Sequence, residues 1–231
     1  MKSRITPGVL ALVAFGGAPG VSSAHNPAYT SSFMLEHCDF SNTGANPYFI
    51  LEPGHQLVLE GFEKNVLVRV TITVLQTTET IDGVDTRVVE ELESHDGETV
   101  ELSQNFFAIC EPSNSVVYFG EEVDIYERGM VVSHDGSWRA GVAGARPGII
   151  MPGVQLLGAR YHQEVAPGVA LDRAETVSID RRVATPAGTF ENCLETKETT
   201  PLEPNSKGVK LYAPDVGLVK DGAVELVSVS P

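Results

Sequence analysis

Hydrophobic and polar residues alternate along much of the chain. The clearest case is the run NVLVRVTITVL at residues 65–75, where Arg69, Thr71 and Thr73 lie between apolar neighbours. The apolar residues on the opposite face are Val66, Val68, Val70, Ile72 and Val74. A period of two is typical of a β-strand with one buried face. Residues 65–75 are therefore predicted to form a strand.

Similar segments follow one another to the end of the chain, separated by turn residues such as Asp82 with Gly83 and Asp221 with Gly222. No stretch shows a helical period with caps. The pattern predicts an all-β fold, an antiparallel meander that forms a strongly curved sheet or a barrel, lipocalin-like in outline. The other predicted strands cover 55–62, 84–94, 98–110, two short runs within 115–127, 158–165, 170–184, 189–200, 209–214, 216–220 and 223–229.

One region interrupts this pattern. Residues 133–158, SHDGSWRAGVAGARPGIIMPGVQLLG, contain six glycines, two prolines and the only tryptophan, Trp138. We predict a long Gly- and Pro-rich loop here, with two open roles. It either plugs one end of the barrel, because small barrels need filled interiors, or acts as a lid or binding loop. The side chains available as a plug are Trp138, Ile149, Ile150 and Met151.

The N-terminus has the pattern of a secretory signal peptide. Lys2 and Arg4 precede an uncharged stretch at 5–21, and small residues at 22–24 offer a cleavage site. Prolines and glycines interrupt the apolar run, and it is too short to span a membrane. We expect a signal peptide at 1–24, a flexible segment at 25–45 and a single β domain at 46–231. The protein is then exported to the periplasm or the extracellular space, with no membrane span.

Charge and cysteine content narrow the function further. The formal net charge is −15, and so acidic a surface repels nucleic acid. The three cysteines are Cys38, Cys110 and Cys193, which in an oxidising compartment predicts one disulfide and one free thiol. All three pairings are open. We favour Cys110 with Cys193, because both fall in clear predicted strands.

Several segments occur in an order that resembles a known family. They are NPYFILEPGHQLVLEG (46–61), VVYFGEEVDIYERGMVVSHDGSWRAGVAGARPGIIMPG (116–153), ALDRAETVSI (170–179), TPAGTFENCLETKETTPLEP (185–204) and LYAPDVGLVKDGAVELV (211–227). Together they are similar to a family of secreted bacterial all-β proteins of unknown function. The chain departs from the family pattern at Asp215, where glycine is usual, and at Gln56 and Leu57. The resemblance implies a secreted barrel or curved sheet and supplies no activity or site.

His25 is a possible copper ligand. Cleavage after Ala24 would leave His25 at the N-terminus, where its amine and ring can bind Cu(II) together with a second histidine. His37 is nearest in sequence, and no paired-histidine motif sharpens the choice. A polar terminus without metal is the simpler interpretation. We therefore predict no cofactor and keep copper as an alternative.

A ligand cavity inside the barrel is the stronger general hypothesis. We expect a non-enzymatic protein that binds a small apolar ligand or an envelope component, with an enzyme acting at the barrel mouth as the alternative. Adjacent acidic residues such as Glu90 with Glu91 and Glu121 with Glu122 are interpreted as a solvated face. The oligomeric state stays open. The candidate ligand-binding residues are Trp138, Arg139, His134, Tyr161 and His162.

Overall fold

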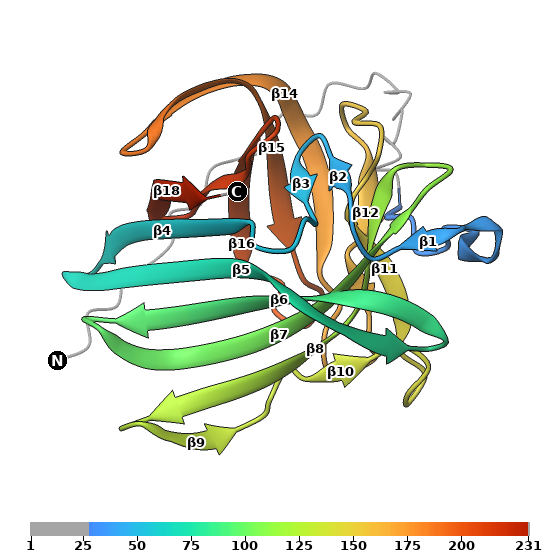
Figure 1. The fold of residues 1–231 in the computed structure, drawn as a ribbon, viewed down its shortest axis with the longest axis horizontal. Helices are drawn as coiled ribbons and strands as arrows, with labels where there is room; N and C mark the ends of the chain where they lie inside the picture. The colour runs from blue at the N-terminus through green and yellow to red at the C-terminus, as the bar shows by residue number, and fades with distance from the viewer. Residues whose placement is uncertain (1–27, 231) are drawn as a thin grey trace, which may run out of the picture.

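The computed structural model describes residues 28–230, and almost every element in it is a β-strand (Figure 1). Among residues 28–230, the one helical element is a short 3-10 turn, Leu35–His37. The strands are β1 (Phe40–Ser41), β2 (Ala45–Asn46), β3 (Phe49–Ile50), β4 (Gln56–Glu63), β5 (Val66–Ile81), β6 (Val84–His95), β7 (Glu98–Cys110), β8 (Ser115–Glu127), β9 (Met130–Ser133), β10 (Trp138–Arg139), β11 (Arg146–Met151), β12 (Arg160–His162), β13 (Glu164–Val165), β14 (Arg173–Thr185), β15 (Gly188–Thr199), β16 (Lys207–Ala213), β17 (Gly217–Asp221) and β18 (Val224–Ser230).

Most strands form one antiparallel sheet that nearly closes into a barrel, and β2 and β3 pair with each other as a separate two-stranded sheet. The hydrogen-bonded order is β12-β14-β15-β16-β17-β18-β4-β5-β6-β7-β8-β11-β13. Its two end strands, β12 and β13, are consecutive in the chain and are separated by Gln163 alone. The Gln163 backbone amide donates a hydrogen bond of 2.8 Å to the Asp172 carbonyl, next to β14. The predicted all-β meander is confirmed, and closure of this kind removes the exposed edges of a sheet.

The region 133–158 is more regular than the sequence predicted. Its segment β11 pairs with β8 on one side and with β13 on the other, so it forms part of the barrel wall. Ile149 and Met151 point from it into the core, with 6 % and 1 % of their surface exposed. Trp138 lies in β10, which pairs with β8 outside the main path. The glycines had suggested a loop, yet Gly148 is needed because its backbone lies against that of Gln163.

The core consists of two apolar clusters. The larger one centres on β7, β8 and β11 and includes Phe106, Val117 and Met151. The smaller one, the β18 cluster, comprises Leu57, Leu59, Val68, Val70, Val183, Cys193, Ala213, Val219, Val224 and Leu226. Strand β5 runs through both, which joins them within one barrel.

The disulfide joins Cys38 to Cys110, so the predicted pairing of Cys110 with Cys193 is wrong. Strand β1 pairs with the end of β7 and places Phe40 opposite Cys110, which brings Cys38 within reach. Cys193 lies elsewhere in the barrel, buried as a free thiol in the β18 cluster. The described part of the predicted flexible segment is therefore tied to the barrel. Within residues 28–230, no helix is long and apolar enough to cross a membrane.

Candidate ligand-binding cavity

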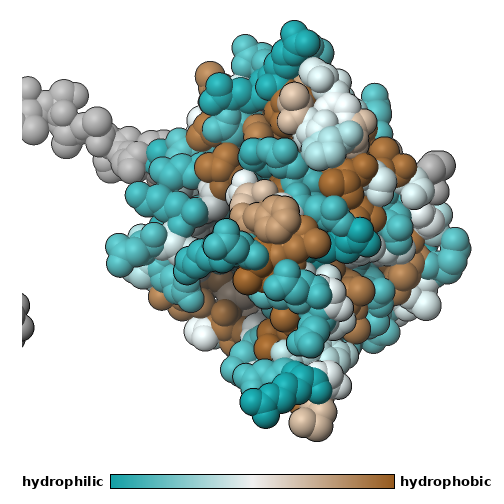
Figure 2. Space-filling model, turned by 90° about the vertical axis from the view of Figure 1, so that its left-hand side faces the viewer, coloured by the Kyte–Doolittle hydropathy of each residue, from teal (hydrophilic) through white to brown (hydrophobic). Residues whose placement is uncertain are grey.

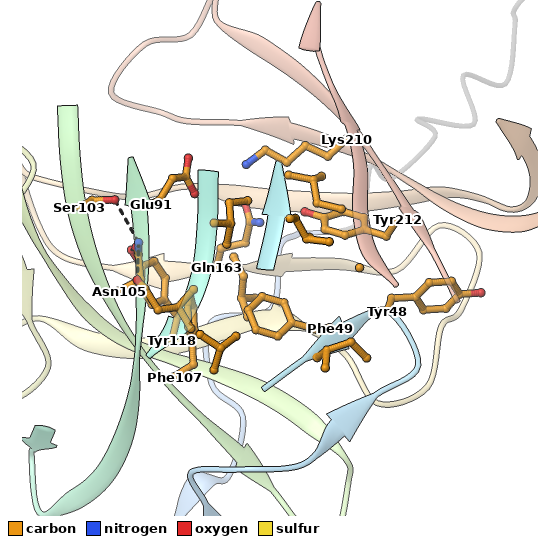
Figure 3. A pocket seen from close by; sticks show the side chains of 18 of the residues that line it. Tyr48, Phe49, Glu91, Ser103, Asn105, Phe107, Tyr118, Gln163, Lys210 and Tyr212 are labelled. Atoms are coloured by element: carbon orange, nitrogen blue, oxygen red, sulfur yellow. Dashed lines mark hydrogen bonds between the residues drawn. The ribbon is translucent and has the colours of Figure 1, made fainter. Parts of the chain in front are cut away.

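A cavity of about 270 Å³ lies inside the barrel (Figure 3). One part of its wall is apolar and aromatic, from Phe49, Ile72, Val74 and Phe107. The other part is polar and strongly acidic. The acidic lining residues are Glu91, Glu101, Glu121, Glu164, Asp172 and Glu198. Figure 2 views the molecule from the left-hand side of Figure 1, where hydrophobic surface is visible in recesses between hydrophilic side chains.

Strand alternation explains how the acidic residues reach the interior. On β6, Glu91 follows buried Val89 on the same face, whereas Glu90 points to the other side of the sheet. Glu91 lies opposite Ser103 of β7, which also lines the cavity. Glu121 is placed in the same way on β8, beside outward-facing Glu122. The interpretation of these pairs as a solvated face therefore holds for only one member of each.

Lys210 is the only lysine or arginine among the residues that line the cavity. Its Nζ lies 3.3 Å from Glu198 Oε2 and 3.5 Å from Asp221 Oδ2. The negative charge of Glu198 raises the pKa of Lys210 well above its usual value. Lys210 is therefore a protonated counter-ion to two carboxylates rather than a neutral amine nucleophile.

A second acidic group spans β8, β13 and the turn before β14. Burial raises the pKa of Glu164 to about 8, and the nearby Asp172 and Glu121 add to the effect. Burial also raises the pKa of Glu121 to about 7. The pKa of Asp172 is raised for the same reason, burial. Near neutral pH this group therefore holds exchangeable protons inside the barrel.

Hydrogen bonds fix the polar wall on the β7 side. The Tyr118 hydroxyl donates to Asn105 Oδ1 at 2.5 Å, and the Asn105 amide donates to Ser103 Oγ at 3.1 Å. Tyr118 also stacks on Phe107, with ring centroids 4.7 Å apart. These residues come from adjacent positions on β7 and β8, so strand pairing sets their order.

Gln163 is the unusual member of the lining. Its side chain is in the seam between β12 and β13, and only 3 % of the residue is exposed. The side-chain amide nitrogen donates to Glu198 Oε1 at 2.9 Å. The side-chain amide oxygen is buried and has no hydrogen-bond partner among the described residues. A buried acceptor without a donor is costly, so this oxygen marks a position where a donor is missing.

The sequence-predicted ligand residues surround the barrel rather than line this cavity. Trp138 is buried against Tyr118, edge to face, at 5.3 Å between ring centroids. Arg139 pairs with Glu79 and Glu122 and covers the ring of Phe106. His134 is exposed and lies 2.8 Å from Asp124 Oδ1. All three lie around β8 and β10; His134 and Arg139 are on the outer face of the sheet, whereas Trp138 belongs to the larger core cluster.

Tyr161 and His162 lie on β12, at the seam. Tyr161 is buried and lines a separate, more open groove with Phe33 and Leu35. His162 meets the ring of Tyr29 edge to face at 6.1 Å. Burial, with Arg173 nearby, lowers the pKa of His162, which leaves it neutral near pH 7. Both flank the cavity wall, and neither contributes a side chain to the lining.

The copper hypothesis gains no support from the described residues. His25 lies outside them, and the ring of His37 is exposed beside Glu36. Nowhere between residues 28 and 230 do three His, Cys, Asp or Glu side chains form a group able to hold a metal ion. Copper binding through His25 stays a prediction.

Comparisons of the chain with protein-family models, with curated proteins and with solved structures gave no match. The function is therefore inferred from the cavity.

The acidic lining is what the sequence interpretation missed. Glu91 and Glu121 had been assigned to the solvent because acids are abundant in this chain. The available signal was the alternation itself, which puts Glu91 on the face of Val89. The aromatic part of the wall comes from Phe49, Phe107, Tyr118 and Tyr212, none of which was among the predicted ligand-binding residues.

Proposed function

We propose that this protein is a non-enzymatic binding protein that holds a small molecule inside its β-barrel. The observation that carries the proposal is the internal cavity with an apolar wall facing a polar one. A barrel interior that served packing alone would be filled with apolar side chains. Here buried carboxyl groups and an unpartnered amide oxygen surround free volume, an arrangement typical of ligand sites.

The lining also refines the expectation of a purely apolar ligand. Such a ligand would cover Phe49, Phe107 and Ile72 well, but it would leave Gln163 and the carboxyl groups without partners. We therefore propose a ligand with an apolar part and a polar part.

We further propose that the protein acts outside the cytoplasm. The signal-peptide pattern at 1–24 supports this location. The Cys38–Cys110 disulfide supports it independently, because such bonds persist in oxidising compartments.

Ligand-observed NMR with a chemically mixed fragment library tests whether the cavity binds small molecules. The decisive variant is Ile72→Phe, which enlarges a side chain that lines the cavity. Its matched control is Thr71→Phe, one residue along β5 on the outer face of the sheet. Fragments are expected to bind the parent protein and Thr71→Phe and to lose binding to Ile72→Phe.

Two results would contradict the proposal. One is the absence of any fragment that distinguishes the two variants. The other is a set of fragments that binds all three proteins equally, which would place binding outside the barrel.

An enzyme is the second candidate, favoured by the acid–base properties of Glu121 and Glu164. Carboxyl groups with a pKa of about 7 and about 8 are suited to proton transfer near neutral pH. This version would use the cavity carboxyls rather than His134, Arg139 or His162. Mass spectrometry of a ligand recovered after long incubation decides between the two. A chemically altered ligand supports an enzyme, and an unaltered one supports a binding protein.

A further inference from the structure

Carboxyl groups are the commonest polar side chains that line the cavity, and they accept hydrogen bonds when ionised. The donors on its wall are used internally: Tyr118 donates to Asn105, and the Asn105 amide donates to Ser103. The Gln163 side-chain nitrogen is likewise used on Glu198. The Gln163 oxygen has no donor among the described residues, and no side-chain hydrogen bond or ion pair there involves the Glu91 carboxyl group. A ligand that satisfies this wall has to donate hydrogen bonds.

The charges point the same way. Six acidic side chains line the cavity, against one lysine. Lys210 is already shared between Glu198 and Asp221. Among the described residues, no lysine, arginine or histidine lies within 4.0 Å of the other five carboxyl groups. Those five are Glu91, Glu101, Glu121, Glu164 and Asp172.

We propose that the cavity binds a small organic cation, a protonated amine carried on a ring-sized apolar body. The inference rests on the proposed binding function and names the chemical class of its ligand. The ammonium group donates to Gln163 Oε1 and pairs with the carboxylates around it, among them Glu91 and Glu164. The apolar body lies against Phe49, Phe107 and Ile72.

Size and wall chemistry favour an amine with an apolar body over other cations. A volume of about 270 Å³ corresponds to roughly nine waters at about 30 Å³ each. A monoamine with one aromatic ring fills such a space. A bare metal ion would leave the aromatic wall unused, and among residues 28–230 no group of three ligands is arranged for one. An anion would meet the carboxylates without compensation.

Protons compete with the amine for the same carboxyl groups. Below its pKa of about 8, Glu164 keeps a proton in the empty cavity, and Glu121 does so below about 7. Ionisation of either group strengthens its attraction for an ammonium ion, so binding improves as pH rises and releases protons. The titratable and charged groups that face the cavity from all its walls are Glu91, Glu101, Tyr118, Glu121, Glu164, Asp172, Glu198, Lys210, Tyr212 and His55, with Asp221 behind Lys210.

Isothermal titration with three compounds of matched shape tests the ligand class. The probes are 2-phenylethylamine, 2-phenylethanol and phenylacetate. The amine is expected to bind at least about tenfold more tightly than the alcohol, because hydrogen bonds to charged groups contribute about 1.5–3 kcal/mol. Phenylacetate is expected not to bind. Amine affinity is expected to rise from about pH 6 to about pH 8.5, with proton release seen in buffers of different ionisation enthalpy.

A matched pair of variants locates the interaction. Glu91→Gln removes a carboxyl group from the cavity, and Glu90→Gln removes one from the other face of the same strand. We expect Glu91→Gln to weaken amine binding about tenfold and Glu90→Gln to change it less than about twofold. Far-ultraviolet circular dichroism confirms that both variants are folded.

The outcomes separate the ligand class from the binding function. If the alcohol or phenylacetate binds the parent protein as tightly as the amine, the cation assignment is overturned and the binding function stands. Failure of all three probes also overturns the assignment, and the fragment experiment with Ile72→Phe then decides the function alone. Equal effects of Glu91→Gln and Glu90→Gln would mean that the amine is attracted by the net negative charge of the protein and not by the cavity carboxyl groups.

Discussion

The β18 cluster and the cavity occupy the same barrel, yet they are lined in opposite ways. Strand β5 contributes Val68 and Val70 to the cluster and Ile72 and Val74 to the cavity. Strand β15 contributes Cys193 to the cluster and Glu198 to the cavity. The backbone geometry is shared, so the difference is due to side chains alone. The β18 cluster buries apolar surface and stabilises the fold, while the cavity holds polar groups whose burial is unfavourable without a partner.

This contrast implies that the buried polar groups of the cavity lower the free energy of unfolding, whereas the apolar side chains of the β18 cluster raise it. Substitutions that make the cluster more polar should therefore destabilise the fold. Substitutions that make the cavity less polar should stabilise it and weaken binding. Measurements of the free energy of unfolding test the contrast, and a truncation in the cluster should produce the largest change.

Leu226 is the residue of choice for that truncation, because it is fully buried and packs opposite Leu59. We expect Leu226→Ala to lower the free energy of unfolding by about 3 kcal/mol, through lost burial and a new void. Urea denaturation measures the change. Val229→Ala, on the same strand at a residue 44 % exposed, serves as the control and should lower it by less than about 1 kcal/mol.

Neutralising a cavity carboxyl should have the opposite sign and depend on pH. The folded protein holds the Glu164 proton up to its pKa of about 8, whereas the unfolded chain releases it near the ordinary value of 4.5. The stabilising effect of that proton is complete below this lower value and is lost as pH rises towards the upper one. We expect Glu164→Gln to raise the free energy of unfolding by about 2–4 kcal/mol at pH 8.5, where the parent carries the buried charge. At pH 4 the two proteins should agree within about 0.5 kcal/mol. An equal gain at both pH values would argue against a buried, ionisable Glu164.

Reciprocal isosteric exchanges sharpen the comparison. Val70 is buried in the cluster, and Thr196 is 2 % exposed on β15 with a hydroxyl that has no partner among the described residues. Val70→Thr should lower the free energy of unfolding by about 1–2 kcal/mol, because it buries a new hydroxyl. Thr196→Val should raise it by about 1 kcal/mol, because it removes a buried unsatisfied one. A loss of stability in Thr196→Val would contradict the expectation that the buried hydroxyl of Thr196 is unfavourable.

A substitution outside both regions should do little. His134 pairs with Asp124 at the surface, with 71 % of its side chain exposed. His134→Ala is expected to change the free energy of unfolding by no more than about 0.5 kcal/mol. It should also leave amine binding unchanged in the titration. A clear loss of amine binding would show that His134 contributes to the ligand site, as the sequence predicted.

Much of the fold was predictable because alternation and turn residues are local properties. The strand expected at 65–75 covers the first part of β5, and Asp82 with Gly83 forms the turn before β6. The pairing of Cys38 with Cys110 was not predictable, because it depends on where β1 lies against β7. Strand β11 was hidden by glycines that allow its backbone to approach Gln163.

The cavity was harder to foresee than the barrel. Alternation assigns Glu91 to the same face as Val89, but it does not reveal whether that face meets packed side chains or open space. The answer depends on all the strands around the barrel together. Gln163 gave no local signal either, since its place in the seam follows from closure of the sheet.

Closure also sets an order of events during folding. Strand β18 pairs with β4, so that Leu226 lies opposite Leu59 and Ser230 opposite Gln56. Most other pairings join strands that are close in sequence and can form early as hairpins. The β18–β4 contact instead joins strands near the two ends of the domain, so it closes a long loop. Until that contact forms, the β18 cluster lacks its partners from β18 and is incomplete.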